Sequence, residues 1–361
     1  MNVDLYGCSD YAFTDLENGY RVAHYVGHLI RYASDSGYWF AWVGNRWQQE
    51  PKGNPKVREL AGAALRRMID EIEPTIARLG LDTKEADRYR AKATAIGSST
   101  SRIAGAIAAA SILPEIAVSH ADFDGKESRN LFNCAHSTID TMTGEARWPA
   151  TDDHITRLAP VTYDARAPRD KWERFLAAAL NDSADDMDRL QRIIGHALIG
   201  ESMYEIHFLH GKEDSGIYLF VDTIRRMLGD YFHSIPLQSF LRMRLTWGNH
   251  DAGKLRAIRA LFLLESGKFD RLPLGNIKWL LDQWEVTGRE PRRGVFTFRP
   301  QCDVFIVSRR PPPTHKLRSG HTVTQFSGKT LQVEFDDADL SGVLNWALEG
   351  LGKYRREGLK P

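Results

Sequence analysis

The residues whose types and spacing point to chemistry form a short loop, Gly211-Lys-Glu-Asp-Ser-Gly216, followed by Ile217 and Tyr218. A phosphate-binding loop of the type G-x-x-x-x-G-K-[ST] cradles phosphates with backbone N–H groups. Its Lys neutralises the phosphates, and its Ser or Thr hydroxyl holds Mg²⁺. Gly211 and Gly216 keep that spacing, but Ile217 occupies the Lys position and Tyr218 the hydroxyl position. The pattern predicts a loop that keeps the glycine spacing of a phosphate-binding loop but lacks its phosphate-binding Lys and its metal-binding hydroxyl.

Two charged residues inside this loop bear on nucleotide binding. Glu213 puts a negative charge where phosphates would lie, and two like charges ~4 Å apart repel by about 1 kcal/mol even in water. Lys212 is the residue that can substitute for the missing cation by reaching in from the loop. We therefore expect no cofactor. ATP and Mg²⁺ would bind only if this degenerate loop works through Gly211, Lys212 and Gly216.

The segments around the loop favour an α/β fold. A short strand is expected over 203–209, before the loop, and a helix over 217–228, closing at Gly229, after it. Apolar runs at 257–264 and 304–307 are typical of buried parallel strands. A strand, a loop and a helix followed by further buried strands indicate α/β architecture.

The N-terminal half is expected to be mainly helical with small β-hairpins. A hairpin is predicted over 38–47, where aromatic residues flank a Gly-Asn turn, and another over 139–148. The aromatic residues of the first hairpin fit either base stacking or packing over a small sheet, and we favour packing. Helices are predicted over 15–33, 56–79, 84–110, 171–179 and 184–199, and a final one over 340–351.

Bulk composition excludes several classes of protein. The 361 residues are 42% hydrophobic and 26% charged, which suits a packed protein and argues against long disorder. Cys8, Cys134 and Cys302 are far apart without metal-ligand spacing, so we expect free thiols in a reducing cytoplasm and no metal. No export signal is visible, and the apolar run 103–118 is too short and broken to span a membrane. A net charge of +1 leaves any nucleic-acid binding to local basic patches.

Longer motifs add a family resemblance. The segment Asp222-Thr-Ile-Arg-Arg-Met-Leu-Gly229-Asp-Tyr231 follows the loop, and Leu340-Ser-Gly-Val-Leu-Asn-Trp-Ala-Leu-Glu-Gly350 lies near the end. Together with motifs in 14–47, 133–144 and 159–195, they resemble the phage and plasmid primase-helicases related to the poxvirus replication protein. Those proteins carry superfamily 3 helicase motors. The motifs span about residues 14 to 356 in the family's order.

The resemblance implies a helical N-terminal domain over 1–200 and an AAA+-like, superfamily 3 helicase-like P-loop NTPase domain over 201–361. It also implies a hexameric, ATP-driven DNA helicase. Glu265 ends a hydrophobic strand where the family places an acid for Mg²⁺ and the attacking water, although we favour the alternative of capping or a solvent-facing strand end. Arg309 stands at the position of a sensor Asn, and Ser319-Gly320 at that of a paired Arg. Altered catalytic positions beside intact packing motifs predict a relaxed demand for ATP hydrolysis.

Two basic clusters are the candidate DNA contacts. The first lies where superfamily 3 motors project a hairpin into their channel, and the second lies in a Pro-rich segment. Solvated loops are the alternative for both. The candidate residues are Arg289, Arg292, Arg293, Arg309, Arg310 and Lys316.

These observations predict a replication-helicase relative of a phage, prophage or plasmid, with impaired ATP hydrolysis and a retained DNA-binding or assembly role. Its expected partners are DNA, single-stranded or forked, and copies of itself or of a helicase, without a membrane. One alternative is an active ATP-dependent helicase with an unusual loop. Another is a non-enzymatic protein that caps or inhibits a helicase hexamer. No primer-synthesis domain is recognisable, so we expect no primase activity.

Overall fold

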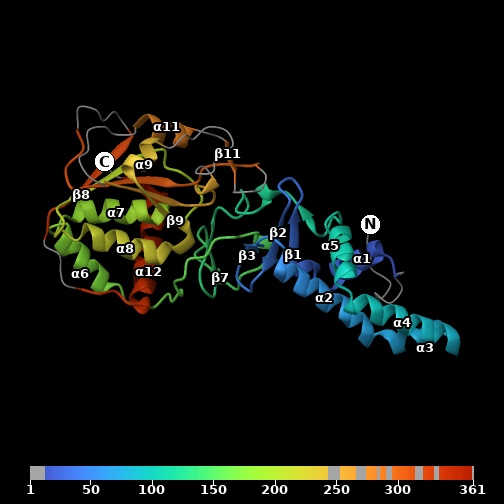
Figure 1. The fold of residues 1–361 in the computed structure, drawn as a ribbon. Coiled ribbons are helices and arrows are strands. Elements are labelled where there is room, and N and C mark those ends of the chain that lie inside the picture. Colours follow the sequence, from blue (N-terminus) through green and yellow to red (C-terminus); the bar gives the residue numbers. More distant parts are fainter. Residues whose placement is uncertain are drawn as a thin grey trace. The chain divides into compact units, whose positions relative to one another are not determined.

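The computed structural model describes residues 13–242, 253–265, 274–282, 285–289, 295–313, 320–328 and 333–359. It divides into two compact units, residues 1–122 and 123–361, and each is described by itself (Figure 1). The boundary near residue 200 that we expect from the family stays a prediction. The boundary between the two observed units follows residue 122, which is 78 residues earlier (200 − 122 = 78).

The first unit joins a helical layer to a small sheet of strand order β3-β2-β1-β4. Strands β1 and β2 pair antiparallel, as do β2 and β3, whereas β1 and β4 pair parallel. Its elements are α1 (Asp15–Val26), η2 (Gly27–Leu29), β1 (Ile30–Ala33), β2 (Tyr38–Trp42), β3 (Trp47–Gln49), α2 (Pro55–Asp70), α3 (Ile72–Leu79), α4 (Thr83–Ser98), α5 (Thr100–Ala110), β4 (Ala117–Val118) and η3 (His120–Asp122).

One helix of this unit is shorter than its sequence predicts. Helix α1 begins after Thr14, whose side chain accepts a hydrogen bond from the Glu17 backbone N–H at 3.2 Å, as expected of an N-cap. It ends at Val26, and Ile30–Ala33 forms strand β1 instead of continuing the helix to residue 33. The reason is tertiary, because β1 pairs with β2 on one side and β4 on the other.

Of the other predictions for the first unit, the hairpin is confirmed and the single long helix is wrong. The aromatic hairpin is present as β2 and β3, with the Val43 N–H donating to the Arg46 carbonyl at 3.0 Å across the turn. Trp47 is fully buried, so packing accounts for this aromatic residue. The predicted helix over 56–79 is interrupted at Glu71. The predicted helix over 84–110 is divided at Ser99, whose side chain caps α5.

The second unit is built on a five-stranded sheet of order β14-β8-β13-β10-β9 (Figure 1). Every neighbouring pair in this sheet is parallel. The elements before and within it are β5 (Leu131–Asn133), β6 (Thr138–Asp140), β7 (Ala146–Arg147), η4 (Thr151–Asp153), α6 (Asp170–Ala179), α7 (Ala184–His196), β8 (Ile206–Gly211), α8 (Ile217–Leu228), η5 (Gly229–Tyr231), β9 (Phe232–Pro236), α9 (Leu237–Arg242), β10 (Ala260–Leu264), α11 (Leu274–Asp282), β11 (Val286–Arg289), β12 (Val295–Phe298), β13 (Asp303–Ser308), β14 (His321–Phe326) and α12 (Asp337–Glu357).

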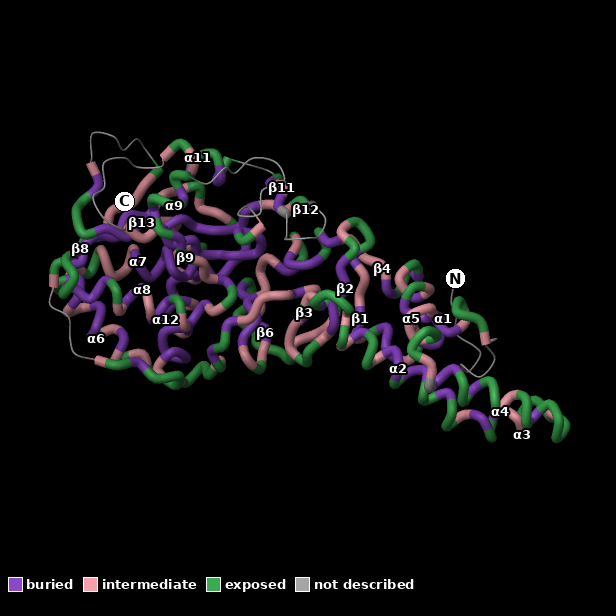
Figure 2. The backbone as a smooth tube through the Cα atoms, viewed as in Figure 1, coloured by how far each residue is buried: buried purple, intermediate pink, exposed green. Residues whose placement is uncertain are grey.

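The five-stranded sheet has a core on each face. Alternate residues of a strand point to opposite faces, and Phe208 and Leu209 of β8 accordingly belong to different clusters. Residues of α6, α7, α8 and α12 share the cluster of Leu209, whereas residues of α9 and α11 share that of Phe208. The three central strands β8, β13 and β10 are buried over nearly all their residues, whereas the edge strands β14 and β9 are partly exposed (Figure 2). The expected α/β class is therefore confirmed.

Several predicted boundaries of the second unit move by a few residues. Strand β8 covers 206–211 instead of 203–209, and β10 begins at Ala260 instead of Ala257. Helix α7 ends at His196, before the predicted stop at Gly200, and α12 extends the predicted final helix in both directions. Helix α8 and its end at Gly229 are as predicted.

Helices α7 and α12 pack with their backbones in close approach. A Cβ added to Gly350 would lie 2.0 Å from the Gln191 carbonyl oxygen, and one added to Gly195 would lie 2.2 Å from the Leu351 nitrogen. Both positions therefore require glycine. The Gln191 side chain also donates to the Trp346 carbonyl at 2.9 Å.

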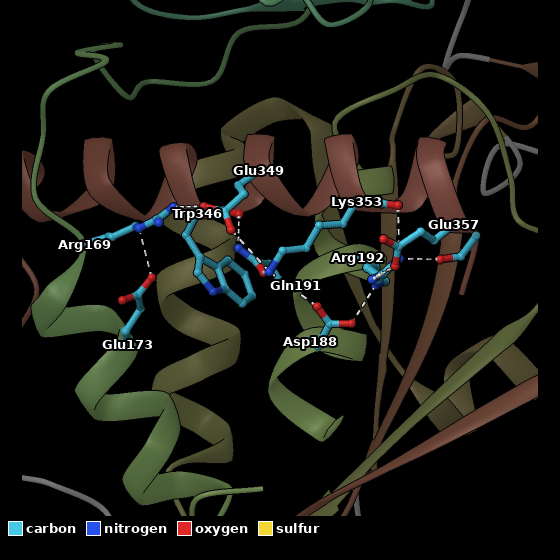
Figure 3. A network of polar contacts seen from close by, with 10 residues as sticks. Arg169, Glu173, Asp188, Gln191, Arg192, Trp346, Glu349, Lys353 and Glu357 are labelled. Atoms are coloured by element: carbon cyan, nitrogen blue, oxygen red, sulfur yellow. Dashed lines mark hydrogen bonds and ion pairs between the residues drawn. The ribbon is translucent and has the colours of Figure 1, made fainter. Parts of the chain in front are cut away.

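A polar network closes the same interface (Figure 3). The buried Arg192 guanidinium donates to Asp188 and Glu357, each at 2.7 Å, and to the carbonyls of Lys353 and Gly358. A buried charge is tolerated when its hydrogen bonds are satisfied in this way. The network fixes the end of α12 on α7.

Two of the three cysteines lie in the described residues. Cys134 and Cys302 are free and buried, and burial raises the pKa of each thiol to about 12. Cys8 lies outside the described residues. None of the described helices combines the length and the apolar content needed to cross a bilayer.

Candidate functional site at the carboxyl edge of the sheet

The carboxyl ends of three parallel strands bring most of the described candidate residues together. Strand β8 leads into the loop 211–216, β13 into Arg309 and Arg310, and β10 into Glu265. The registers Ser308↔His210 and Leu264↔Val307 align these ends. Ligands of open parallel sheets bind beyond this edge, so the site predicted from the sequence lies where a nucleotide would bind.

The loop after β8 is a tight turn that uses its own polar groups. The backbone N–H of Ser215 donates to the Lys212 carbonyl at 3.1 Å, and the Ser215 hydroxyl donates to the same oxygen at 2.7 Å. Gly216 has φ +88°, which favours glycine, and opens helix α8. Ser215 is buried, so the one hydroxyl between the two glycines faces inward and serves the turn.

Ile217 is part of the hydrophobic core. Its exposed fraction is 1%, and it belongs to the cluster formed by α6, α7, α8, α12 and one face of the sheet. Gly216 in front of it lies against Phe175 and Ala179 of α6, since an added Cβ would approach each to 3.2 Å. The position of the family's Lys therefore points into packed apolar side chains.

Arg309 is the cation that reaches the loop. Its guanidinium lies 3.6 Å from the Glu213 carboxylate, and a hydrogen bond with Tyr218, followed by the charge of Glu213, raises the pKa of Arg309. The Glu265 carboxylate accepts the Arg309 backbone N–H at 2.7 Å. Glu265 thus binds the turn after β13, which matches the capping alternative for this residue.

Formal charge around this edge is balanced. Lys212, Glu213 and Asp214 are exposed in the loop, and Arg309 and Arg310 are exposed after β13. With Glu265, three basic side chains face three acidic ones, which gives +3 − 3 = 0. A triphosphate would meet no surplus of positive charge from these residues.

The candidate DNA contacts fall in two places. The backbone of Arg289 ends β11, which pairs antiparallel with β12 from Val286↔Phe298 to Arg289↔Val295, so this region does form a hairpin. Arg309 and Arg310 lie at the carboxyl edge of the sheet instead. Arg292, Arg293 and Lys316 lie outside the described residues. A DNA contact by any of them stays a prediction.

Buried polar groups at the opposite edge were not found from the sequence. His196 and Asp303 form a fully buried pair at 2.7 Å, and Asp303 also accepts the Met203 backbone N–H at 2.8 Å. His207 lies close to them, and burial lowers its pKa to about 4. His196 and Asp303 are 107 residues apart in the chain, and no local pattern links them.

Arg259 is a second polar group that the sequence did not single out. It is buried, donates to the Leu131 carbonyl at 2.7 Å and to the Leu198 carbonyl, and lies 4.3 Å from the centre of the Tyr231 ring.

Within the described residues, no group of three or more His, Cys, Asp or Glu side chains is arranged to hold a metal ion.

Comparison with known proteins finds one family match for part of the sequence and several solved structures with a similar fold. Residues 19–181 match the family described as "D5 N terminal like". Among solved structures, one of the "NrS-1 C terminal region-CTR" has a TM-score of 0.51 at 11% identity, covering 95% of this chain and 69% of that one. Residues 19–181 therefore carry a sequence likeness to that family, in agreement with the primase-helicase resemblance of the motifs.

Two further structures of the same region resemble this chain. The "apo structure of NrS-1 C terminal region (305-718)" has a TM-score of 0.50 at 10% identity, covering 92% of this chain and 67% of that one. A second A-form structure of the region gives 0.51 at 12%, with 97% and 70% covered. At this identity the likeness concerns the fold. No curated protein matches the chain.

Proposed function

We propose that this primase-helicase relative acts in replication of a phage or plasmid by binding DNA or by assembling with a helicase, with impaired ATP hydrolysis. In this proposal its second unit is a P-loop domain of the superfamily 3 helicase type whose nucleotide site has decayed. The all-parallel sheet supports this, because β8, the loop and α8 stand in the strand–loop–helix order of such domains.

The observation that carries the proposal is the burial of Ile217. A phosphate-binding Lys has to extend from the helix start towards the loop's concave side. Here the side chain at that position is 1% exposed and packs in the core. The Ser215 hydroxyl, bonded to the Lys212 carbonyl, supplies no metal ligand in its place.

The test is a titration of the chain with a fluorescent ATP analogue and Mg²⁺, beside the Glu265→Gln variant. We expect no saturation up to about 5 mM nucleotide, beyond the usual range of enzyme KM values. Saturable binding by the wild type that Glu265→Gln abolishes would instead identify a working ATPase.

DNA binding is measured separately with labelled single-stranded DNA at about 50 and 200 mM salt. We expect binding that weakens with salt and does not change when ATP is added. A chain that binds neither DNA nor an intact helicase of the same family would contradict the proposed role.

A further inference from the structure

A polar cavity of about 240 Å³ lies at the amino edge of the five-stranded sheet, opposite the degenerate loop. It is formed where the chain enters β8 and β13, which are parallel neighbours with the register Val304↔Ile206. Its lining residues are Arg129, Gly200, Glu201, Ser202, Tyr204, Arg299 and Pro300. Nothing in the catalytic pattern of the sequence accounts for this cavity.

Tyr204 is held in a conformation that costs energy. Its φ is +58°, in the left-handed region that a bulky L-residue rarely adopts. Its backbone N–H donates to the Ser202 hydroxyl at 3.1 Å, and its own hydroxyl accepts from Arg299 at 3.0 Å. The side chain is nevertheless 55% exposed. Strain of this kind is commonly kept where the side chain has a role in binding.

One nitrogen of the Arg129 guanidinium lacks a hydrogen bond. Its Nε is buried without a hydrogen-bond partner among the described residues. Its Nη1 lies 3.8 Å from the Glu201 carboxylate, which is an ion pair beyond hydrogen-bond distance. Gly200 lets the chain pass close by, since an added Cβ would lie 3.3 Å from the Arg129 Cα.

The charge of the lining selects an anion. Arg129 and Arg299 contribute +2 and Glu201 contributes −1, so the cavity carries +1. The planar guanidinium of arginine can donate two parallel hydrogen bonds to the oxygens of one phosphate. The exposed Tyr204 ring beside them offers a stacking surface, which free phosphate does not use but a nucleotide base does.

We propose that this cavity binds one phosphate of single-stranded DNA, with the adjoining base stacked on Tyr204. Arg299 follows directly after β12, so the cavity lies at the base of the β11–β12 hairpin. This position joins it to the hairpin where we predict phosphate contacts. The inference rests on the proposed DNA-binding role and adds a contact site to it.

The experiment measures binding of labelled oligothymidine to the full chain at several salt concentrations. Tyr204→Gly removes the ring and also relieves the positive φ, so the fold is kept. We expect it to weaken binding about 5- to 100-fold, as for loss of one stacked base. Tyr204→Phe keeps the ring and is expected to bind within about twofold of the wild type.

Arg299→Gln tests the phosphate contact. For single strands, each lost phosphate contact makes the negative slope of log K against log salt shallower by about 0.7. We expect this change for Arg299→Gln. Arg174→Gln is the matched control, because Arg174 is an exposed arginine of α6 with no part in the cavity. Thermal melting of every variant checks that the fold is intact.

The outcomes separate this inference from the proposed function. If the wild type binds no single-stranded DNA, both fail. If the wild type binds and Tyr204→Gly and Arg299→Gln equal it in affinity and salt slope, the cavity has no such role and the inference alone is overturned. A weakened Tyr204→Gly variant beside an unchanged salt slope for Arg299→Gln also overturns it, because the phosphate contact is then absent.

Discussion

Replacing Ile217 with lysine restores the family's residue, but we expect it to destabilise the second unit without creating a nucleotide site. The side chain is 1% exposed in the core, and removing a buried Ile from apolar surroundings costs about 1.5–3 kcal/mol. A cation at the start of α8 opposes the helix dipole by a further ~0.3–1 kcal/mol. Part of the loss is recovered because the Lys stem is apolar. The expected loss of unfolding free energy is about 2–4 kcal/mol.

The assay is thermal unfolding with and without Mg-ATP. For a unit of this size each kcal/mol shifts Tm by ~2–4 °C, so Ile217→Lys should melt roughly 5–15 °C lower. Ile217→Met is the control, because a swap that conserves volume usually costs under about 1.5 kcal/mol. A lysine variant that melts like the wild type and is further stabilised by Mg-ATP would show that the pocket remained open, and our reasoning would be refuted.

Two further predictions concern packing and pH. Gly350→Ala places a methyl 2.0 Å from the Gln191 carbonyl oxygen and should cost about 3 kcal/mol in a chemical melt. Gly352→Ala is the control, because the added Cβ would lie 3.5 Å from Arg356 Nη1. We expect it to raise the free energy of unfolding by ~0.5–1 kcal/mol. Equal effects of the two substitutions would contradict the close approach of α7 and α12. Burial lowers the pKa of His207 from 6.5 to about 4, so between pH 6.5 and 4 the unfolded chain takes up a proton that the folded one refuses. The free energy of unfolding has its highest contribution from neutral His207 above pH 6.5, and it should fall by roughly 3 kcal/mol as the pH drops from 6.5 to 4. Thermal melts of His207→Gln should lack this part of the pH dependence.

Local patterns were sufficient where one segment carries the whole signal. The apolar face of α8 and its closing glycine predicted that helix to the residue, and the Gly-Asn turn predicted the β2–β3 hairpin. The loop that the two glycines mark does follow a strand, β8. The same spacing puts Ile217 on the apolar face of that helix, but its packing beside α6, whose residues precede it by about forty positions, was not predictable from the spacing.

Sequence reasoning was wrong or silent where distant segments decide the structure. Residues 30–33 continue the apolar periodicity of α1, but pairing with β2 and β4 makes them a strand. The partners of Arg129, Tyr204 and Arg299 come from three separate segments around one cavity. Nothing in the local spacing of these residues connects them, so the amino-edge cavity was visible only in the structure.

The contact between α7 and α12 bears on how the protein is made. Gln191 and Trp346, which join these helices, are 155 residues apart. A ribosome adding ~5–20 residues per second needs roughly 8–30 s to produce the second helix after the first. During that delay the apolar face of α7 in the nascent chain is exposed to solvent. Chaperone binding would help the chain most in this period. Slowed translation between the two segments should therefore lower the yield of properly folded product more than slowing elsewhere.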